Sequence, residues 1–447
     1  MENKTTFNRW WVVIGALLIQ LSLGAIYIYS VFKPALKERF PDWSDTDLAL
    51  PSQLVLAFFA ISMIFAGRIQ DKLGPRLIAT LGGVFLGVGL LIASFATNLT
   101  VFVIGFSIIG GIGVGTAYVC PIATCVKWFP DKRGLITGLA VAGFGAGALL
   151  FTPVAKSLIS DQGIMTTFMY LGIIFLIAVV IGAQFMKVPP AGYKPAGWNP
   201  PVQPGSNQSN PHNDFSTSQM LKTSQFWLLW LTYFAGCTAG LMIIMNVTNV
   251  WQSTSFLKHI ADGEAMIKAD VYKAITTAGA TAVMIVAILN AFGRIAWGKI
   301  SDMIGRRKTL IIMLLLAGVV MLVLNLLKSY ETYIIGVSII GLCFGGFLAL
   351  YPAVTADYFG TKNVGANYGW MFTAYGAGGL FGPWLAPKLM EVVEKIQYET
   401  LDKANEVMIS AVPYNAGNYQ MAFVISGIMC LVAAVLVYFI RQPRLKA

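Results

Sequence analysis

The fold is decided by a short motif that occurs twice in the chain, first as GRIQDKLGPR at residues 67–76. It returns 231 positions later as GKISDMIGRR at residues 298–307. A second landmark follows the same offset, because four glycines of WFPDKRGLITGLAVAGFGAG (128–147) are matched by glycines of YFGTKNVGANYGWMFTAYGAG (358–378). Since two separate landmarks share one offset, we infer an internal repeat of about half the chain.

Long apolar segments surround both copies of the motif. Hydrophobic residues make up 57% of the 447 residues and charged residues only 11%, against about a quarter in soluble domains. Runs of roughly 17 to 25 apolar residues can cross a bilayer, and continuous runs favour helices over a barrel. We therefore expect an all-α membrane protein with twelve transmembrane helices, beginning near Trp10, Leu48, Leu77, Leu99, Leu135, Met165, Phe226, Thr276, Leu310, Thr332, Asn367 and Gln420.

A polar segment divides these spans six and six. Between Lys187 and Leu221 the chain has seven prolines and few apolar residues, which is typical of an extended linker. We expect an N-terminal half over residues 1–186, a cytoplasmic linker over 187–222 and a C-terminal half over 223–447. At the end of the linker, Ser216 and Gln219 have the spacing of a capping box and predict a short helix.

The distribution of charge predicts orientation. With alternate loops assigned to opposite sides, the side of the N-terminus holds 19 Lys/Arg and 6 Asp/Glu, and the other side holds 11 and 14. The positive-inside rule then places both termini in the cytoplasm, in a plasma (inner) membrane. The net charge of +11 thus reflects topology and not nucleic-acid binding. No signal-peptide cleavage site follows the first span, so we expect this span to remain as a membrane anchor.

Metal, cofactor and nucleotide sites are not expected. Five cysteines all fall in apolar segments, as small buried hydrophobes do, and the two histidines lie in predicted loops. GRIAWGKI at 293–300 is a near miss for a phosphate-binding loop, but no strand precedes it and Ile300 stands where Ser or Thr should hold magnesium. The spans also contain no Asp, Glu or His for acid–base chemistry, so an enzyme is not favoured.

The repeated motif, Gly-x-x-x-Asp-Lys/Arg-x-Gly-x-Arg, resembles the signature of the major facilitator superfamily. Within it, four stretches resemble the oxalate/formate antiporter family, which includes bacterial monocarboxylate carriers: NDFSTSQMLKTSQFWLLW, KWFPDKRGLITG, NAFGRIAWGKISDMIGRRKT and YFGTKNVGANYGW. The resemblance covers nearly the whole chain. It implies two pseudo-symmetric halves of six helices that rock about a central site, and transport of a small carboxylate anion with protons or a counter-transported anion.

The two motif copies predict a gate at the cytoplasmic ends of the helices. Charges there can form a network that latches the gate, while the glycines permit a tight turn. The alternative is that these charges only set the topology. The residues expected in the latch are Gly67, Asp71, Arg76, Asp302 and Arg306.

Arg294 lies in the apolar run AVMIVAILNAFGRIAWGKISD, residues 282–302. A charge near the centre of a span costs roughly 2.5 to 3.5 kcal/mol, yet no acidic residue lies well inside any of the twelve segments. One interpretation is that Arg294 reaches the cytoplasmic interface, since Gly298 and Lys299 follow closely. The other is that its missing counter-ion is the transported carboxylate, which a guanidinium holds bidentately.

The family resemblance implies the second interpretation, because the related carriers use an arginine at this position as the carboxylate anchor. Asn290 lies one turn earlier on the same face. Oxalate carriers of the family have a lysine where this chain has Tyr375, and a dianion needs two cations, so we expect a monocarboxylate such as lactate, pyruvate or formate. Further expected cavity residues, or else ordinary packing residues, are Tyr27, Tyr118, Phe344 and Phe372.

The sequence therefore predicts a monomeric, proton-coupled carrier of small monocarboxylates in the lipid bilayer, with oxalate/formate-type anion exchange as the alternative. Asp270, just before the eighth span, is a candidate for proton coupling, although a carboxylate at a helix start needs no such role. A sensor is not favoured, because the linker and tail are short.

Overall fold

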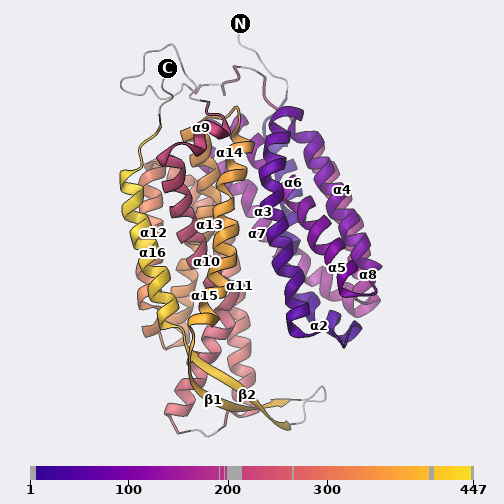
Figure 1. Ribbon diagram of the computed structural model, residues 1–447, viewed down its shortest axis with the longest axis vertical. Helices are drawn as coiled ribbons and strands as arrows, with labels where there is room; N and C mark the ends of the chain where they lie inside the picture. Colours follow the sequence, from indigo (N-terminus) through magenta and orange to yellow (C-terminus); the bar gives the residue numbers. More distant parts are fainter. Residues whose placement is uncertain are drawn as a thin grey trace.

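The computed structural model describes residues 7–190, 192–195, 197–198, 214–263, 266–401 and 407–443. Its helices form two groups that stand side by side (Figure 1). The first group contains α1 (Trp10–Leu23), α2 (Tyr29–Arg39), α3 (Asp45–Leu73), α4 (Pro75–Ser94), α5 (Leu99–Phe102), α6 (Gly110–Trp128), α7 (Arg133–Gln162) and α8 (Ile164–Gln184). A 3₁₀ stretch, Gly24–Ile28, joins α1 to α2, and a π-helical stretch, Val103–Ile109, joins α5 to α6.

The second group follows the linker. It contains α9 (Thr217–Leu221), α10 (Ser224–Ala261), α11 (Ala269–Ile304), α12 (Arg306–Val323), α13 (Tyr330–Phe359), α14 (Val364–Met371), α15 (Thr373–Leu389) and α16 (Gln420–Phe439), with a 3₁₀ turn at Leu324–Leu326. The predicted short helix is α9, and its capping box between Ser216 and Gln219 is confirmed. Within the expected linker, residues 191, 196 and 199–213 lie outside the described residues.

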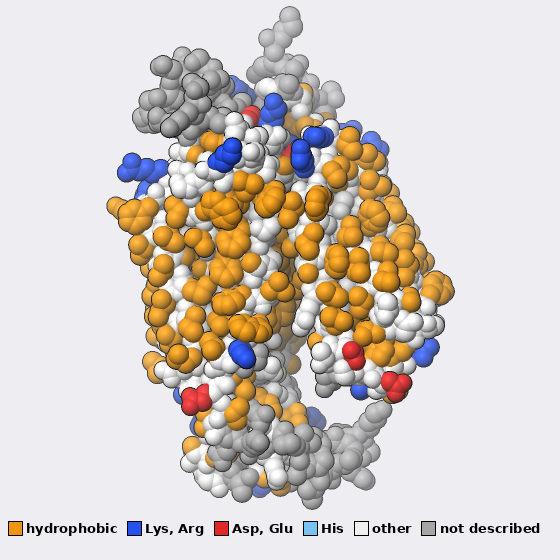
Figure 2. Space-filling view, in the orientation of Figure 1, with side chains coloured by type: hydrophobic (Ala, Val, Ile, Leu, Met, Phe, Trp, Pro, Cys, Tyr) orange, Lys and Arg blue, Asp and Glu red, His pale blue; other side chains and the backbone are white. Residues whose placement is uncertain are grey.

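Eleven helices of the described chain are long and apolar enough to cross a membrane. The expected span near Asn367 is divided at Phe372 into α14 and α15, each of which is shorter than a full span. These two helices follow one another along one path (Figure 1) and make the remaining crossing. Exposed apolar side chains form a belt across the middle of the face seen in Figure 2, and charged residues lie toward its two ends, as expected for a surface that faces lipid.

The structure also has an element that the apolar pattern did not predict. Between α15 and α16, β1 (Glu391–Leu401) and β2 (Val407–Asn418) form an antiparallel hairpin. It packs against the adjacent ends of α10 and α11, where the Tyr272 and Tyr398 rings stack with centroids 4.3 Å apart. We call the face that holds this hairpin the lower face, and the opposite face, where α3 ends and α7 begins, the upper face (Figure 1).

Each copy of the repeated motif turns at a glycine that ends one helix and starts the next. Gly74, between α3 and α4, has φ of 91°, and Gly305, between α11 and α12, has φ of 93°. Glycine adopts such positive values readily, whereas other residues are strained there. These two positions are also 231 residues apart, so the repeat in the sequence is a repeat of backbone geometry.

Candidate functional site

Arg294 lies at the interface between the two groups of helices and is only 1% exposed. Its Nε donates to Asn290 Oδ1 at 3.1 Å, one turn earlier on α11. Its Nη1 donates to the carbonyl oxygen of Val141 on α7, in the other half, at 2.5 Å. Gly145 leaves the space for this contact, because a Cβ there would lie 3.0 Å from the guanidinium carbon. The side chain therefore crosses to the opposite half and does not extend along its own helix to the upper face.

The two acceptors of Arg294 are both uncharged. No ion pair in the described part of the chain includes this residue, and its Nη2 donates to no described group. Val141 lies eight residues into α7, about 12 Å below the upper end at 1.5 Å per residue. A permanent positive charge is thus held inside the apolar belt with donors left for an anion.

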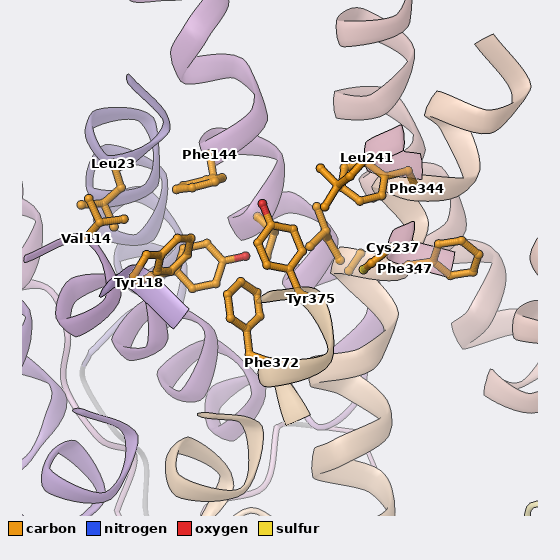
Figure 3. Packing of buried hydrophobic residues seen from close by; sticks show 14 of the residues in the cluster. Leu23, Val114, Tyr118, Phe144, Cys237, Leu241, Phe344, Phe347, Phe372 and Tyr375 are labelled. Atoms are coloured by element: carbon orange, nitrogen blue, oxygen red, sulfur yellow. The ribbon is translucent and has the colours of Figure 1, made fainter. Parts of the chain in front are cut away.

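Aromatic side chains from both halves surround this position. Tyr27 and Tyr375 share a hydrogen bond of 2.7 Å between their hydroxyls, which joins the two halves. Phe372 stacks on Tyr375 at 4.6 Å and packs against Tyr118 at 5.3 Å. Tyr118 and Phe144 of the first half face Phe372 and Tyr375 of the second across the interface (Figure 3).

The remaining expected residues fall at different distances from Arg294. Tyr27 and Tyr118 pack against Phe144, whose neighbour Gly145 lies against the Arg294 guanidinium. Phe344 on α13 stands farther out and reaches the site through Tyr375, with ring centroids 6.5 Å apart. Asp270 does not belong to the site, because it is exposed in the first turn of α11. It precedes Arg294 by 24 residues, or about 36 Å along the helix.

Sequence reasoning missed two members of the aromatic wall. Phe59 on α3 packs against both Tyr118 and Phe372, at 5.0 and 5.1 Å. Phe144 on α7 packs against Tyr27 and Tyr118, at 5.2 and 4.9 Å. The 231-residue offset could have identified both residues, because it relates Phe59 to Asn290 and Phe144 to Tyr375, which were expected in the site.

The expected latch residues meet at the upper face, and the arrangement is symmetric. Asp71 at the end of α3 accepts the backbone N–H of Ala366 at 2.8 Å, at the start of α14 in the other half. Asp302 at the end of α11 accepts the N–H groups of Gly134 and Leu135 at 2.9 and 2.8 Å, at the start of α7. Each carboxylate therefore caps a helix N-terminus of the opposite half, where a negative charge is favoured.

Glycines bring the helices close enough for these hydrogen bonds. A Cβ on Gly67 would overlap the carbonyl of Gly365, and a Cβ on Gly298 would overlap the carbonyl of Gly134. These two pairs are again related by the 231-residue offset. The upper face is thus closed by two equivalent backbone contacts, α3 with α14 and α11 with α7.

The ion pairs around the two aspartates differ. Asp302 pairs with Arg306 at 2.7 Å, Arg306 also pairs with Asp357 at 2.8 Å, and Asp357 pairs with Arg133 of the other half at 2.6 Å. Asp71 has a single ion pair in the described chain, with Lys127 of its own half at 3.2 Å. Arg76 does not join the latch, because its guanidinium donates to Gln184 within the same half.

Below this closed region the two halves part. The surface is hollowed between them toward the lower face (Figure 2). Tyr27 remains partly exposed, whereas Arg294, Tyr118 and Tyr375 are buried. The conformation is therefore closed at the upper face and parted at the lower one, with the arginine between. Within the described residues no group of three or more His, Cys, Asp or Glu side chains is arranged to hold a metal ion.

The sequence profile of the Major Facilitator Superfamily matches residues 8–263 and 264–447. The chain belongs to this superfamily. It is thus a multi-pass membrane transporter with the major facilitator fold, as the repeated motif predicted. A solved major facilitator structure, the proton:xylose symporter XylE bound to 6-bromo-6-deoxy-D-glucose, superposes with a TM-score of 0.66 over 98% of this chain and 96% of that one. At 15% identity, this likeness shows the fold alone.

Relatives within the superfamily include carriers of small carboxylates. The chain is 27% identical to the oxalate:formate antiporter of Oxalobacter formigenes, over 84% of this chain and 83% of the relative. It is 24% identical to monocarboxylate transporter 2 of Rattus norvegicus, over 92% of this chain and 84% of the relative. The predicted resemblance to the oxalate/formate antiporter family is therefore confirmed.

Proposed function

We propose that this major facilitator transporter carries small monocarboxylate anions, of the lactate, pyruvate or formate type, by alternating access. Arg294 holds the carboxylate, and Asn290, Tyr27, Tyr118, Tyr375, Phe344 and Phe372 shape its surroundings. The upper face is cytoplasmic and the membrane is the plasma (inner) membrane, in accord with the excess of Lys and Arg on that side. The protein works as a monomer.

The observation that carries the proposal is the state of Arg294. Its charge lies inside the apolar belt, and its acceptors in the described chain are one side-chain amide and one backbone carbonyl. Neutral acceptors orient a guanidinium without cancelling its charge, so a carboxylate that reaches it gains a full ion pair in a low-dielectric site. The unused Nη2 is the donor from which that interaction starts.

The number of charges at the site argues for a monoanion. Tyr375 occupies the position where the oxalate carriers have lysine, and its hydroxyl bonds to Tyr27. With Arg294 as the one cation at this level of the described chain, the second carboxylate of oxalate would enter the apolar wall unpaired, at a cost of several kcal/mol. The aromatic rings of Phe59, Phe144 and Phe372 instead suit a small apolar tail.

The closed latch and the parted lower face suggest how the cycle runs. In the present conformation an anion enters from the lower face and meets Arg294, whose Val141 contact already links the two halves. Closing the halves around the anion at the lower side requires the α3–α14 and α11–α7 contacts at the upper side to separate. The latch carboxylates then release their helix N-termini, and the site opens to the cytoplasm.

Proton symport is the coupling that we propose, because accumulating an anion against a negative interior costs roughly 2.3 kcal/mol per 100 mV. Exchange of one carboxylate for another, as in oxalate/formate antiport, is the alternative, since it needs no net charge movement. Asn290 rather than a carboxylate stands beside Arg294, so an aspartate–arginine proton relay is not part of the proposal.

Uptake by proteoliposomes tests both the proposed substrate class and the proposed proton coupling. Labelled lactate, pyruvate, formate and oxalate are offered with an inward proton gradient, without a gradient, and with unlabelled anion inside. We expect lactate or pyruvate uptake that rises several-fold with the gradient and is abolished by a protonophore. Rapid oxalate exchange that is indifferent to the gradient would overturn the monocarboxylate and symport assignments together.

The proposed orientation has its own test. All five native cysteines are buried, so a cysteine introduced at an exposed site can be labelled against a low background. Lys222→Cys, before α10, should react with an impermeant maleimide only in inside-out vesicles. Lys388→Cys, at the end of α15, should react only in right-side-out cells, and the reverse pattern would invert the topology.

A further inference from the structure

A cavity with several charged side chains in its lining lies far from the transport site, at the upper face of the C-terminal half. It has a volume of about 590 Å³. The turn between α11 and α12 forms one wall, and the upper ends of α13 and α16 form the others. Its charged lining residues are Arg306, Arg307, Lys308 and Asp357, and the Tyr438 ring also lines it.

The charge of this cavity is positive. Arg306 is neutralised by Asp302 and Asp357, at 2.7 and 2.8 Å. Arg307 has no carboxylate partner in the described chain: its Nε donates to the carbonyl of Val437 at 3.2 Å, and its guanidinium lies 4.8 Å from the Tyr438 ring centroid. Lys308 is exposed and belongs to no ion pair among the described residues. Two uncompensated cations therefore face one cavity.

The cavity opens at the edge of the membrane-facing surface. Tyr438 and Phe439 at the end of α16 are 64% and 65% exposed, and Ile312 of α12 is 39% exposed. Apolar side chains cover the outer surface of these two helices, with Lys and Arg gathered above them (Figure 2). An aromatic residue at such a boundary marks the depth of the lipid headgroups. A ligand in this cavity would thus meet cations at headgroup level and apolar surface directly below.

The equivalent turn in the N-terminal half lacks this chemistry. The offset of 231 relates Arg306, Arg307 and Lys308 to the segment Pro75-Arg76-Leu77. The single cation there, Arg76, already donates through Nε and Nη2 to Gln184. Since the fold repeats the turn but not its charges, the cations of the C-terminal turn are not required to build it.

We propose that this cavity binds the phosphate of an anionic phospholipid from the leaflet at the upper face. Arg307 and Lys308 hold the phosphate oxygens, the stacking of Arg307 on Tyr438 fixes the guanidinium, and the acyl chains lie on α12 and α16. Arginine pairs with phosphate in a bidentate geometry, and each nearby cation contributes to binding of anionic lipid headgroups. The proposal does not depend on what the transporter carries.

Native mass spectrometry of the full-length protein tests the site. Protein purified in detergent is titrated with phosphatidylglycerol, and separately with phosphatidylcholine. We expect wild type to retain one phosphatidylglycerol with an affinity that falls about fivefold when Lys308→Gln removes one cation. The Arg307→Gln/Lys308→Gln variant should bind more than tenfold more weakly, and no variant should change phosphatidylcholine binding.

The matched control is Arg68→Gln/Lys299→Gln, which removes two exposed cations from the same face outside the cavity. It should retain the lipid like wild type, and weaker retention by this control would mean that only the overall charge of the face matters. Equal retention by wild type and both cavity variants would overturn the proposal. Protection by inorganic phosphate alone against thermal unfolding, with no further effect of phosphatidylglycerol, would assign the site to a soluble phosphate and overturn the lipid assignment.

Discussion

Helices α3 and α11 occupy equivalent places in the two halves but present different chemistry to the centre. The 231-residue offset relates Phe59 and Met63 of α3 to Asn290 and Arg294 of α11. Their backbones pack in the same way, because Gly369 lies against the carbonyl of Met63 as Gly138 lies against the carbonyl of Arg294. The repeated scaffold therefore places both pairs beside the same interface.

Under the proposed function, the difference between these helices is where transport chemistry enters a symmetric fold. Both halves provide aromatic rings, but the N-terminal half adds a backbone carbonyl, whereas the C-terminal half adds the charge and the amide that orients it. A cation on both sides would attract a dianion, and none on either side would leave a desolvated anion without a partner. One cation opposite a neutral wall is the arrangement that suits a monoanion.

Removing the charge that distinguishes α11 from α3 should have the largest effect on carboxylate uptake. Arg294→Met gives α11 the residue that α3 carries, and the cargo carboxylate then enters the apolar site unpaired. Because an uncompensated buried charge costs about 3–5 kcal/mol, we expect lactate or pyruvate uptake to fall at least about 100-fold. Initial rates in proteoliposomes, normalised to protein reconstituted, measure the loss.

Two variants make that experiment specific. Met63→Leu changes the equivalent position without touching a charge and should keep uptake within about twofold of wild type. Arg294→Lys keeps the charge but loses the bidentate fork, so we expect weaker binding of every carboxylate tested. Wild-type binding by the lysine variant would rule out the bidentate anchor.

The next largest effect concerns the latches, where one ion pair crosses between the halves and another does not. Asp357→Asn removes the carboxylate between Arg133 and Arg306 and thereby the cross-half pair. Lys127→Gln removes the pair with Asp71, which lies within one half. A hydrogen bond to a charged group contributes about 1.5–3 kcal/mol, and this pair is partly buried, so Asp357→Asn should shift the equilibrium toward an open upper face by about tenfold.

Spin-label distances between Arg68→Cys and Lys299→Cys report this equilibrium, because these exposed residues lie on opposite halves of the upper face. We expect a longer distance to become populated in Asp357→Asn and the distribution in Lys127→Gln to resemble the parent. An equal shift in both variants would show that the latch responds to total charge and not to the connection between halves.

A moderate change of specificity is expected at Tyr375, whose equivalent in the other half is Phe144. Tyr375→Lys adds a second cation beside Arg294, and one further charged hydrogen bond of about 1.4 kcal/mol corresponds to tenfold in affinity. We expect oxalate to compete about tenfold better against lactate. Tyr375→Met, of similar length and without charge, should not improve oxalate binding, and an improvement there would trace the effect to the lost Tyr27 hydrogen bond.

Much of this architecture could be predicted from the sequence, because it depends on patterns that the sequence shows. The apolar runs predicted the membrane spans. The 231-residue offset predicted that Asp71 and Asp302 occupy equivalent positions in the two halves. The partner of Arg294 could not be found in this way, because a backbone carbonyl such as that of Val141 belongs to every residue type. The β1–β2 hairpin was missed because the apolar runs of this connection, such as VMISAV at 407–412, are too short to cross a bilayer.

The sequence also could not predict the orientation of individual side chains. The sequence around Phe59 does not indicate which neighbour its ring contacts, and Arg76 shares a motif with Asp71 but donates to Gln184 within its own half. Helical spacing fixes a face, whereas the neighbour on that face depends on tertiary packing. Sequence reasoning therefore located the central cation more reliably than the wall around it.

The smallest effect is expected at Asp270, which tests whether proton coupling depends on the outer end of α11. Its carboxylate is exposed about 36 Å from Arg294 along the helix, and salt screens exposed charges beyond about 10 Å. Asp270→Asn should therefore leave both the uptake rate and its dependence on the proton gradient within twofold of wild type. A variant that still transports by exchange but no longer responds to the gradient would place the proton acceptor at the lower mouth, and the asymmetry around Arg294 would then explain anion recognition without explaining coupling.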